Sequence, residues 1–169
     1  MKDTNIILIG FMGVGKGTVA RAIVEKSGMY AIDTDDLIES MENRKIKKIF
    51  EEEGEPYFRE LEKKTALWLE NNVKGTLIST GGGFYKQENL KKIGKVVYLK
   101  SSFKGILDRI NSAPNAKNKL RKRPLLKDLK AATKLFNERA PLYEGIADIV
   151  VDVEKKDIKL IVKEILGQI

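Results

Sequence analysis

The chain of 169 residues contains no cysteine. Disulfide bonds, catalysis by a thiolate and zinc sites built on sulfur are therefore excluded, and the composition is compatible with a reducing compartment. Histidine is absent as well. Any general base must therefore be a carboxylate, a lysine or a tyrosine, and near neutral pH a carboxylate is the plausible choice.

Long apolar runs are also missing. The first residues lead into a short strand pattern without the longer apolar region of a secretory signal, and no run is long enough to span a bilayer. We therefore expect a cytoplasmic protein with no membrane partner. We also expect a single domain over residues 1–169, since chains of roughly 150 residues already bury about 70% of their unfolded surface.

Acidic residues are fewer than basic ones, at 24 against 32, and the net charge is +8. This balance suits polyanionic ligands such as nucleotides and acidic metabolites, or nucleic acid. We interpret much of the excess as solvated helix faces, in the pairs Lys63-Lys64, Lys91-Lys92 and Lys155-Lys156. Since no basic stripe is interleaved with exposed aromatic residues, we expect no nucleic-acid partner.

Five short apolar runs alternate with stretches of helical periodicity, at Ile6–Ile9, Tyr30–Ile32, Thr76–Ser79, Val96–Leu99 and Ile149–Val151. The runs are β-branched and almost free of charge, as in parallel strands that helices cover on both faces. The pattern predicts a doubly wound α/β fold with a five-stranded sheet, and ligands should gather at the carboxyl ends of the strands.

Helical periodicity predicts four helices over Thr18–Lys26, Pro56–Asn71, Leu129–Arg139 and Asp157–Leu166, the third of which should end before Pro141. Residues 111–122 show no clear periodicity and contain Pro114. We interpret them as a mobile surface loop, and loops of this length in a compact domain are often lids.

A glycine-rich turn, Gly10 to Thr18, follows the first strand and precedes a helix. Such a turn points several backbone N–H groups into one concavity, where the helix dipole also favours anions, so it predicts a P-loop that holds a nucleoside triphosphate. Lys16 would reach the outer phosphates. The pattern has one defect, because Gly17 stands where a magnesium-ligating hydroxyl is usual and Thr18 follows it. The alternative interpretation is a strand-to-helix turn that binds nothing.

Carboxylates and glycines follow the next two strands. Asp33, Asp35 and Asp36 lie within one turn near the P-loop, and their mutual repulsion calls for a cation or a polar substrate. Alternatively, Asp33 or Thr34 caps a helix that begins with acidic residues, with Asp36 as the residue that starts it. Gly81-Gly82-Gly83 follows the third strand and would let a ligand approach the main chain closely, although a simple turn is the alternative.

Three arginines stand in local contexts that fix the backbone: Phe58-Arg59, Arg123-Pro124 and Arg139-Ala140-Pro141. The planar guanidinium group suits a two-point hold on a carboxylate or a phosphate. Position in the sequence does not show whether these groups converge.

The ordered set of motifs resembles the shikimate kinase family, which has the nucleoside monophosphate kinase-like P-loop fold. The resemblance covers nearly the whole chain and rests on Gly10–Lys16, Asp33-x-Asp35, Phe58-Arg59, Gly81–Gly83, Arg123–Leu126 and Glu138–Tyr143. It implies the strand order 2-3-1-4-5, a shikimate-binding segment at about 33–61 and a lid at about 111–124. It also implies transfer of the γ-phosphoryl group of ATP to the 3-hydroxyl of shikimate, in chorismate and aromatic amino acid biosynthesis.

The resemblance further implies a role for each matching residue. Asp35 would act as base or orienter for the attacking hydroxyl, Arg59 and Arg139 would clamp the carboxylate of shikimate, and Gly81, Gly82 and Gly83 would line its site. The phosphates of ATP would lie on Gly13, Val14, Gly15, Lys16, Gly17 and Thr18, with Arg123 neutralising the transferring group. Mg²⁺ would be held by Asp33, with Thr18 near the position where Gly17 lacks a side chain. Arg109 and Lys156 would border adenine.

Two features depart from the family. Gly17 replaces the usual serine, which predicts an additional water on the metal or a shift towards Thr18 or Asp33, and the lid is several residues longer. Because adenylate kinases also have Gly-Lys-Gly-Thr here, kinases of gluconate or of a nucleoside monophosphate remain alternatives, as does a P-loop NTPase that binds nucleic acid. We expect a monomer with small-molecule substrates only.

Overall fold

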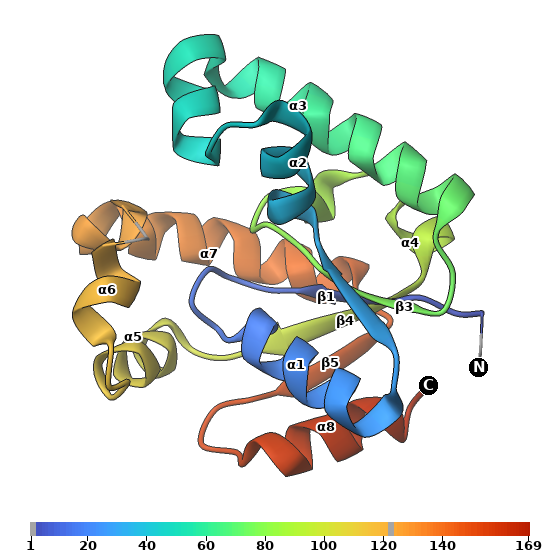
Figure 1. Cartoon of the computed structure of the whole chain (residues 1–169). Helices are drawn as coiled ribbons and strands as arrows, with labels where there is room; N and C mark the ends of the chain where they lie inside the picture. Colours follow the sequence, from blue (N-terminus) through green and yellow to red (C-terminus); the bar gives the residue numbers. More distant parts are fainter. Residues whose placement is uncertain (1–2, 122–123) are drawn as a thin grey trace.

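The computed structural model describes residues 3–121 and 124–169. Its centre is a parallel five-stranded sheet in the order β2-β3-β1-β4-β5 (Figure 1), which confirms the predicted architecture and order. The strands are β1 (Ile6–Ile9), β2 (Tyr30–Asp33), β3 (Thr76–Ser79), β4 (Lys95–Lys100) and β5 (Ile149–Asp152). Since β1 is central, the loop after it lies between the loops that follow β3 and β4.

Helices cover both faces of the sheet and give three layers (Figure 1). On one face α1 packs against α8, while α3, α4 and α7 lie on the other. The α-helices are α1 (Lys16–Ser27), α2 (Thr34–Glu42), α3 (Ile46–Asn72), α4 (Leu90–Ile93), α5 (Phe103–Asn111), α6 (Ala116–Arg121), α7 (Leu129–Ile146) and α8 (Ile158–Leu166). Two short 3-10 helices, η1 (Phe84–Lys86) and η2 (Pro124–Lys127), complete the described elements. None of the helices in the described ranges is long and apolar enough to cross a membrane.

The apolar character of the strands follows from this layering. Every residue of β1 is buried, and the inner residues of β3 and β4 are buried beside it. The edge strand β2 is more exposed, and Tyr30 keeps 84% of its surface accessible. The carboxyl ends of β1, β2 and β3 therefore meet at one edge of a rigid sheet, where the following loops carry polar groups.

A second, smaller apolar cluster lies under α2 and α3, with Ile38, Ile49, Phe58 and Leu61 as its buried members. It holds these two helices together outside the main core. Inside α3, Gly54 adopts φ 84° and ψ 171°, so the helix is broken there and Pro56 begins its second part. The cluster fixes the direction of that second part, on which Arg59 lies.

Two predictions about elements were wrong. Helix α7 does not end before Pro141 but continues to Ile146. A proline inside a helix loses one hydrogen bond, but here Tyr143 is 1% exposed and its ring packs against Tyr85 and Tyr98. This tertiary packing outweighs the local cost.

The expected loop over residues 111–122 is also partly helical, because α6 occupies Ala116–Arg121. Leu120 packs against the main core from this short helix. One apolar anchor is too little to give a periodicity that can be recognised in the sequence.

Candidate active site at the carboxyl edge of the sheet

The glycine-rich turn after β1 has the backbone of a P-loop. Gly10, Gly13 and Gly15 have φ values of 147°, 83° and 108°, which side chains other than glycine rarely adopt. Helix α1 begins at Lys16, so its N-terminal dipole points into the turn. The Lys16 ammonium group donates to the carbonyl oxygens of Gly10, at 2.6 Å, and Phe11, at 3.2 Å. The lysine is thereby held across the loop.

Arg109 reaches the P-loop from α5. Its guanidinium group donates to the Gly13 carbonyl oxygen at 3.3 Å and to the Thr18 hydroxyl at 3.2 Å. A Cβ atom on Gly15 would lie 2.6 Å from the Arg109 Nη2 atom. Gly15 therefore needs to be glycine both for its backbone angle and for the approach of this arginine.

A cavity of about 410 Å³ joins the predicted groups from separate elements. Its walls include Gly13, Gly15, Lys16, Gly17 and Thr18 of the P-loop region, Asp33 and Asp35 after β2, Gly81 and Gly82 after β3, and Arg109. The glycine-rich turn and the carboxylates thus line one cavity. Motifs that are separate in the sequence are brought together by the fold.

Each of the three consecutive glycines lies against a different charged side chain, and we call Gly81–Gly83 the glycine platform. A Cβ atom added to Gly81 would lie 2.6 Å from Asp35 Oδ1, one on Gly82 would lie 2.9 Å from Arg139 Nη1, and one on Gly83 would lie 2.5 Å from Arg59 Nη1. Each glycine therefore makes room for a different side chain. The carboxylate of Asp35 and the guanidinium groups of Arg139 and Arg59 converge on three adjacent residues.

Asp35 is a strongly perturbed carboxyl group. Burial is the main cause that raises its pKa to about 7; the negative charges of Asp33 and Glu62 contribute to this rise, and Lys16 opposes it. Its Oδ1 atom is buried and accepts no hydrogen bond within the described part of the protein. A buried acceptor without a donor is costly, so this atom is suited to receive a hydrogen bond from the hydroxyl group of a ligand.

Asp33 and Thr34 hold the backbone around Asp35. Asp33 Oδ1 accepts hydrogen bonds from the N–H groups of Asp35, at 2.9 Å, and Asp36, at 3.2 Å, so the predicted N-cap is present at Asp33. The buried Thr34 hydroxyl accepts from the Gly81 N–H at 3.1 Å. The loop after β2 is thereby attached to the glycine platform after β3.

Arg59 is fixed by two glutamates of its own helix. It donates from Nη1 to Glu62 at 2.7 Å and from Nη2 to Glu55 at 2.8 Å. Glu62 is 1% exposed, and burial raises its pKa although Arg59 lowers it. Glu62 was not predicted from the sequence, although its place three residues after Arg59 on one helix face was the available signal.

Arg139 and Tyr143 lie one turn apart on α7, at the other side of the platform. The Tyr143 hydroxyl donates to the Gly82 carbonyl oxygen at 2.6 Å. Burial raises the pKa of Tyr143 to about 12, so it remains a donor at neutral pH. The continuation of α7 through Pro141 therefore matters for the site, since it connects the helix to the glycine platform.

The residues predicted to bind Mg²⁺ line one cavity, but they offer few ligand atoms. Asp33 and Thr18 line the same cavity as Gly17, which offers no side chain. No group of three acidic residues that could hold a metal alone occurs in residues 3–121 and 124–169. Mg²⁺ is commonly bound through one or two carboxylates, waters and the phosphates of a nucleotide, and the donors present fit that mode of binding.

A second cavity, of about 400 Å³, lies on the other side of Arg109. Val14, Arg109 and Lys156 line it, together with residues of the loop between β5 and α8. Lys156 donates to both carboxylate oxygens of Glu164 at 2.9 Å. Lys155 has φ 56°, which is uncommon for a residue with a side chain. The predicted adenine-bordering residues Arg109 and Lys156 thus share one pocket.

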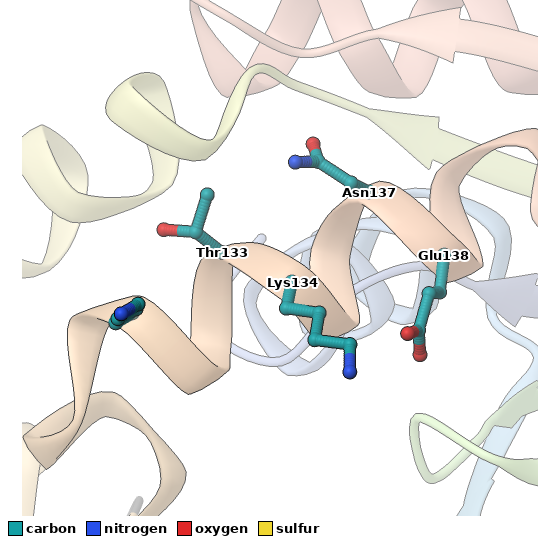
Figure 2. A pocket seen from close by; sticks show the side chains of 5 residues that line it. Thr133, Lys134, Asn137 and Glu138 are labelled. Carbon is teal, nitrogen blue, oxygen red and sulfur yellow. The ribbon is translucent and has the colours of Figure 1, made fainter.

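Arg123, the remaining predicted catalytic residue, lies outside the described residues. A further hollow on the surface, of about 570 Å³, is lined by Lys130, Thr133, Lys134, Asn137 and Glu138, which among the described residues all belong to α7. Figure 2 shows these side chains on successive turns of one helix, and all five residues are exposed. Because no second element contributes to it, this hollow is not a built binding site.

Comparisons with known proteins show what the whole chain is similar to. The family model for shikimate kinase (SKI) matches residues 12–169. A shikimate kinase of Sulfurihydrogenibium sp. (strain YO3AOP1) is 43% identical, covering 98% of this chain and 97% of that protein. One from Helicobacter hepaticus is 39% identical over 88% of this chain and 86% of its own length.

Solved structures give the same result. Shikimate kinase from Aquifex aeolicus is 35% identical with a TM-score of 0.77, covering 96% of this chain and 94% of that one. Shikimate kinase from Acinetobacter baumannii in complex with shikimate is 33% identical with a TM-score of 0.74, covering 98% and 92%. A gluconokinase from Sinorhizobium meliloti, 14% identical with a TM-score of 0.53 over 98% and 91%, shares the fold alone.

Proposed function

The chain belongs to the shikimate kinase family, and we propose that it transfers the γ-phosphoryl group of ATP to the 3-hydroxyl of shikimate, giving shikimate 3-phosphate and ADP. The observation that carries this proposal is the convergence of Asp35, Arg139 and Arg59 on Gly81–Gly83, beside the P-loop. A small acceptor with both a carboxylate and hydroxyl groups complements one acidic and two cationic side chains at one place.

Arg59 and Arg139 are proposed to hold the carboxylate of shikimate. Both guanidinium groups approach adjacent glycines, so one carboxylate could receive hydrogen bonds from the two. Hydrogen bonds between charged groups are about twice as strong as neutral ones. Glu55 and Glu62 keep Arg59 oriented, so little side-chain freedom is lost when the acceptor binds.

Asp35 is proposed to orient the attacking hydroxyl and to accept its proton. Its buried Oδ1 atom needs a donor, and the 3-hydroxyl would supply one. A base with a pKa near 7 is half ionised at neutral pH and is well matched to this work. We expect kcat/KM for shikimate to rise with pH and to level off above about 7.

Lys16 and the N–H groups of the P-loop are proposed to hold the β- and γ-phosphates, with Arg123 as a further cation on the transferring group. In phosphoryl transfer the protein has little covalent chemistry to perform, so catalysis comes from position and from charge stabilisation. Lys16 must give up its contacts with Gly10 and Phe11 to reach a phosphate. The lid at about 111–124 would exclude water, which competes with the acceptor hydroxyl.

Mg²⁺ would be held by Asp33 and by waters, with Thr18 nearby, and when bound it neutralises charge on the phosphates. Adenine would lie in the second cavity between Arg109 and the loop at Lys156. For this arrangement Arg109 must leave Gly13 and Thr18 as the triphosphate enters the P-loop.

We further propose that the whole chain is one kinase domain with a shikimate-binding segment at about 33–61. We also propose that it acts as a cytoplasmic monomer in chorismate and aromatic amino acid biosynthesis and binds neither membranes nor nucleic acid. Size-exclusion chromatography with light scattering tests the monomer, and an apparent mass of about twice 19.1 kDa would contradict it.

The experiment that tests the function is ADP release from MgATP with shikimate, gluconate or AMP as the acceptor. Turnover is expected with shikimate alone, and Asp35→Asn and Arg139→Ala should each reduce it by at least about 100-fold, the usual order of effect for a base or a positioning group. Lys159→Ala, on the exposed face of α8, is the matched control and should leave the rate unchanged. Turnover with AMP or gluconate instead would overturn the assignment of the arginine clamp.

A further inference from the structure

Nearly all of the net charge of the protein lies in one segment, residues 116–134, which we call the basic segment. It contains eight of the 32 lysines and arginines but one of the 24 acidic residues, so the other 150 residues hold 24 cations and 23 anions. The pairs Lys63-Lys64, Lys91-Lys92 and Lys155-Lys156 therefore do not account for the excess. The net charge of +8 is concentrated in one place.

The cations of this segment that the structure describes are exposed and form no ion pairs. They are Lys117, Arg121, Lys127, Lys130 and Lys134. None of the five forms an ion pair with any residue that the structure describes. The single acid, Asp128, is engaged as the N-cap of α7, where it accepts a hydrogen bond from the Ala131 N–H at 3.0 Å.

Several lysines elsewhere in the chain form ion pairs with acidic side chains. Lys100 pairs with Glu144 at 3.0 Å, and Lys104 pairs with Asp108 at 2.6 Å. Local pairing cancels the field of such cations within a short distance. The described cations of the basic segment lack such pairing, so their field extends into solvent.

The place of the basic segment in the fold brings the electric field of its cations to the side of the P-loop cavity. Helix α6 packs on α5, and α5 supplies Arg109 and Ile110 to the wall of that cavity. Figure 1 shows α6 next to α5 and the first turns of α7 beyond α6, on the side towards which the loop between β1 and α1 projects. Lys134, labelled in Figure 2, lies on an exposed part of α7.

We propose that the basic segment attracts nucleoside triphosphates towards the P-loop before contact and thereby raises the rate of their association. The inference rests on the proposed function in one respect, since it takes the P-loop as the nucleotide site. Charges act over about 10 Å at 0.1 M ionic strength, and a field of one sign beside a cleft raises association rates by about 10- to 1,000-fold. A triphosphate, the most highly charged reactant, gains most.

A small polyanion fits the segment better than nucleic acid does. Residues 116–134 contain no phenylalanine, tyrosine or tryptophan, whereas proteins that bind single strands stack bases on such rings. The contribution of the segment is therefore charge without a stacking surface. None of the five described cations lines the P-loop cavity, so we assign to them an effect on the approach of the nucleotide.

The test compares two triple variants that remove the same charge. Lys127→Gln, Lys130→Gln and Lys134→Gln together neutralise part of the basic segment, and all three lie outside the lid at about 111–124. Lys63→Gln, Lys74→Gln and Lys92→Gln neutralise exposed lysines on α3, before β3 and on α4, away from the cavity. Association of a fluorescent ribose-labelled ATP is followed by stopped flow between about 20 and 300 mM salt, over which the Debye length falls several-fold.

The variant of the basic segment is expected to bind at least about threefold more slowly at the lowest salt and to converge with the wild type at the highest. Its dependence on salt should be weaker, and the same nucleotide as a monophosphate should show a smaller difference. The control triple should match the wild type. Equal slowing in both triples, or no slowing in either, would overturn the proposal.

Two further measurements distinguish nucleotide attraction from nucleic-acid binding and from a failure of the proposed function. A fluorescent single-stranded oligonucleotide is added to each protein at low salt, and a loss of its binding in the basic-segment triple, with unchanged nucleotide association, would assign the segment to nucleic acid instead. Phosphoryl transfer to shikimate is measured separately at saturating substrates. Absence of that turnover in the wild type would refute the proposed function, while the association rates would still decide the inference about charge.

Discussion

Asp35 lowers the free energy of unfolding of the protein, although it is a residue of the candidate site. Because its pKa is raised from 3.8 to about 7, the native state binds this proton more tightly than the unfolded chain does. The free energy of unfolding therefore falls as the pH rises from about 4 to about 7. The protein retains this buried carboxylate beside Asp33 and Glu62 in spite of the lower free energy of unfolding.

Replacing Asp35 by asparagine removes that cost. At pH 8 we expect the free energy of unfolding of Asp35→Asn to exceed that of the wild type by on the order of 2 kcal/mol. This is about half of the free energy that corresponds to the full pKa shift, because Asp35 is not completely buried. The gain should be smaller at pH 5. Urea denaturation at both pH values measures it, and an equal gain at both would refute the link to titration.

Gly17 offers a second prediction at the same scale. Among the residues that the structure describes, a Cβ atom added there meets only Arg21 Nη1, at 3.6 Å, so a serine fits without strain. We expect Gly17→Ser to bind Mg²⁺ about three- to tenfold more tightly in the presence of ADP, which corresponds to about 0.7–1.4 kcal/mol. Calorimetric titration of Mg²⁺ measures this.

The control for that prediction is Gly17→Ala, which adds the same Cβ atom without a hydroxyl. It should bind Mg²⁺ as the native protein does. Should the native protein bind the metal as tightly as Gly17→Ser, or more tightly, the missing hydroxyl would have no bearing on the metal.

At the scale of elements, the junction of α2 and α3 depends on a cluster around Arg44. This guanidinium group contacts Glu42 at the end of α2, at 2.7 Å, and Glu52 and Glu53 in the first part of α3, at 2.8 and 3.0 Å. It also lies 5.9 Å from the ring centroid of Tyr57, beyond the break at Gly54. The cluster therefore spans the break that sets the direction of Arg59.

Removing Arg44 is expected to affect acceptor binding rather than chemistry. In Arg44→Ala the second part of α3 loses one of the contacts that hold it in place. The KM for shikimate should therefore rise by about threefold or more, while kcat stays nearly unchanged. This is the effect expected when a network of charges positions an element. Steady-state kinetics with each substrate varied measures the split. Lys47→Ala, which removes an exposed pair on the same helix at 3.7 Å, should have no effect. A change in kcat alone would count against a positioning role.

The same elements show how far the sequence could predict the site. The P-loop, Asp35 and Gly81–Gly83 were predictable because each follows an apolar strand in a parallel sheet. Arg59 and Arg139 were candidates from their local contexts, and the resemblance supplied their roles. Glu62 was missed because a glutamate within a polar helix gives no sign of burial. The end of α7 was misplaced because the contacts of Tyr143 with Gly82 and two other tyrosines arise only in the folded chain. The cluster around Arg44 was not predictable either, because its contacts depend on the angle between α2 and α3, which arises only in the folded chain.

For the whole molecule, the edge of the sheet opposite the active site is tied together by one buried residue. Asn5 is 3% exposed, and its side-chain amide donates to the carbonyl oxygens of Val73, at 2.7 Å, and Ile93, at 2.8 Å. Its side-chain oxygen accepts from the Thr76 N–H at 3.0 Å. One side chain before β1 thus joins the segments that lead into β3 and β4.

Loss of this residue should therefore destabilise the fold without a direct effect on the site. Asn5→Ala leaves buried backbone groups of two loops without partners, each at a cost of about 1–3 kcal/mol. We expect a decrease of about 3 kcal/mol in the free energy of unfolding, which for a chain of this length lowers Tm by roughly 6–12 °C. Because the edge that carries the P-loop is remote from Asn5, kcat at 25 °C should be unchanged while the protein remains folded. A variant that keeps its Tm would show that water replaces the lost partners.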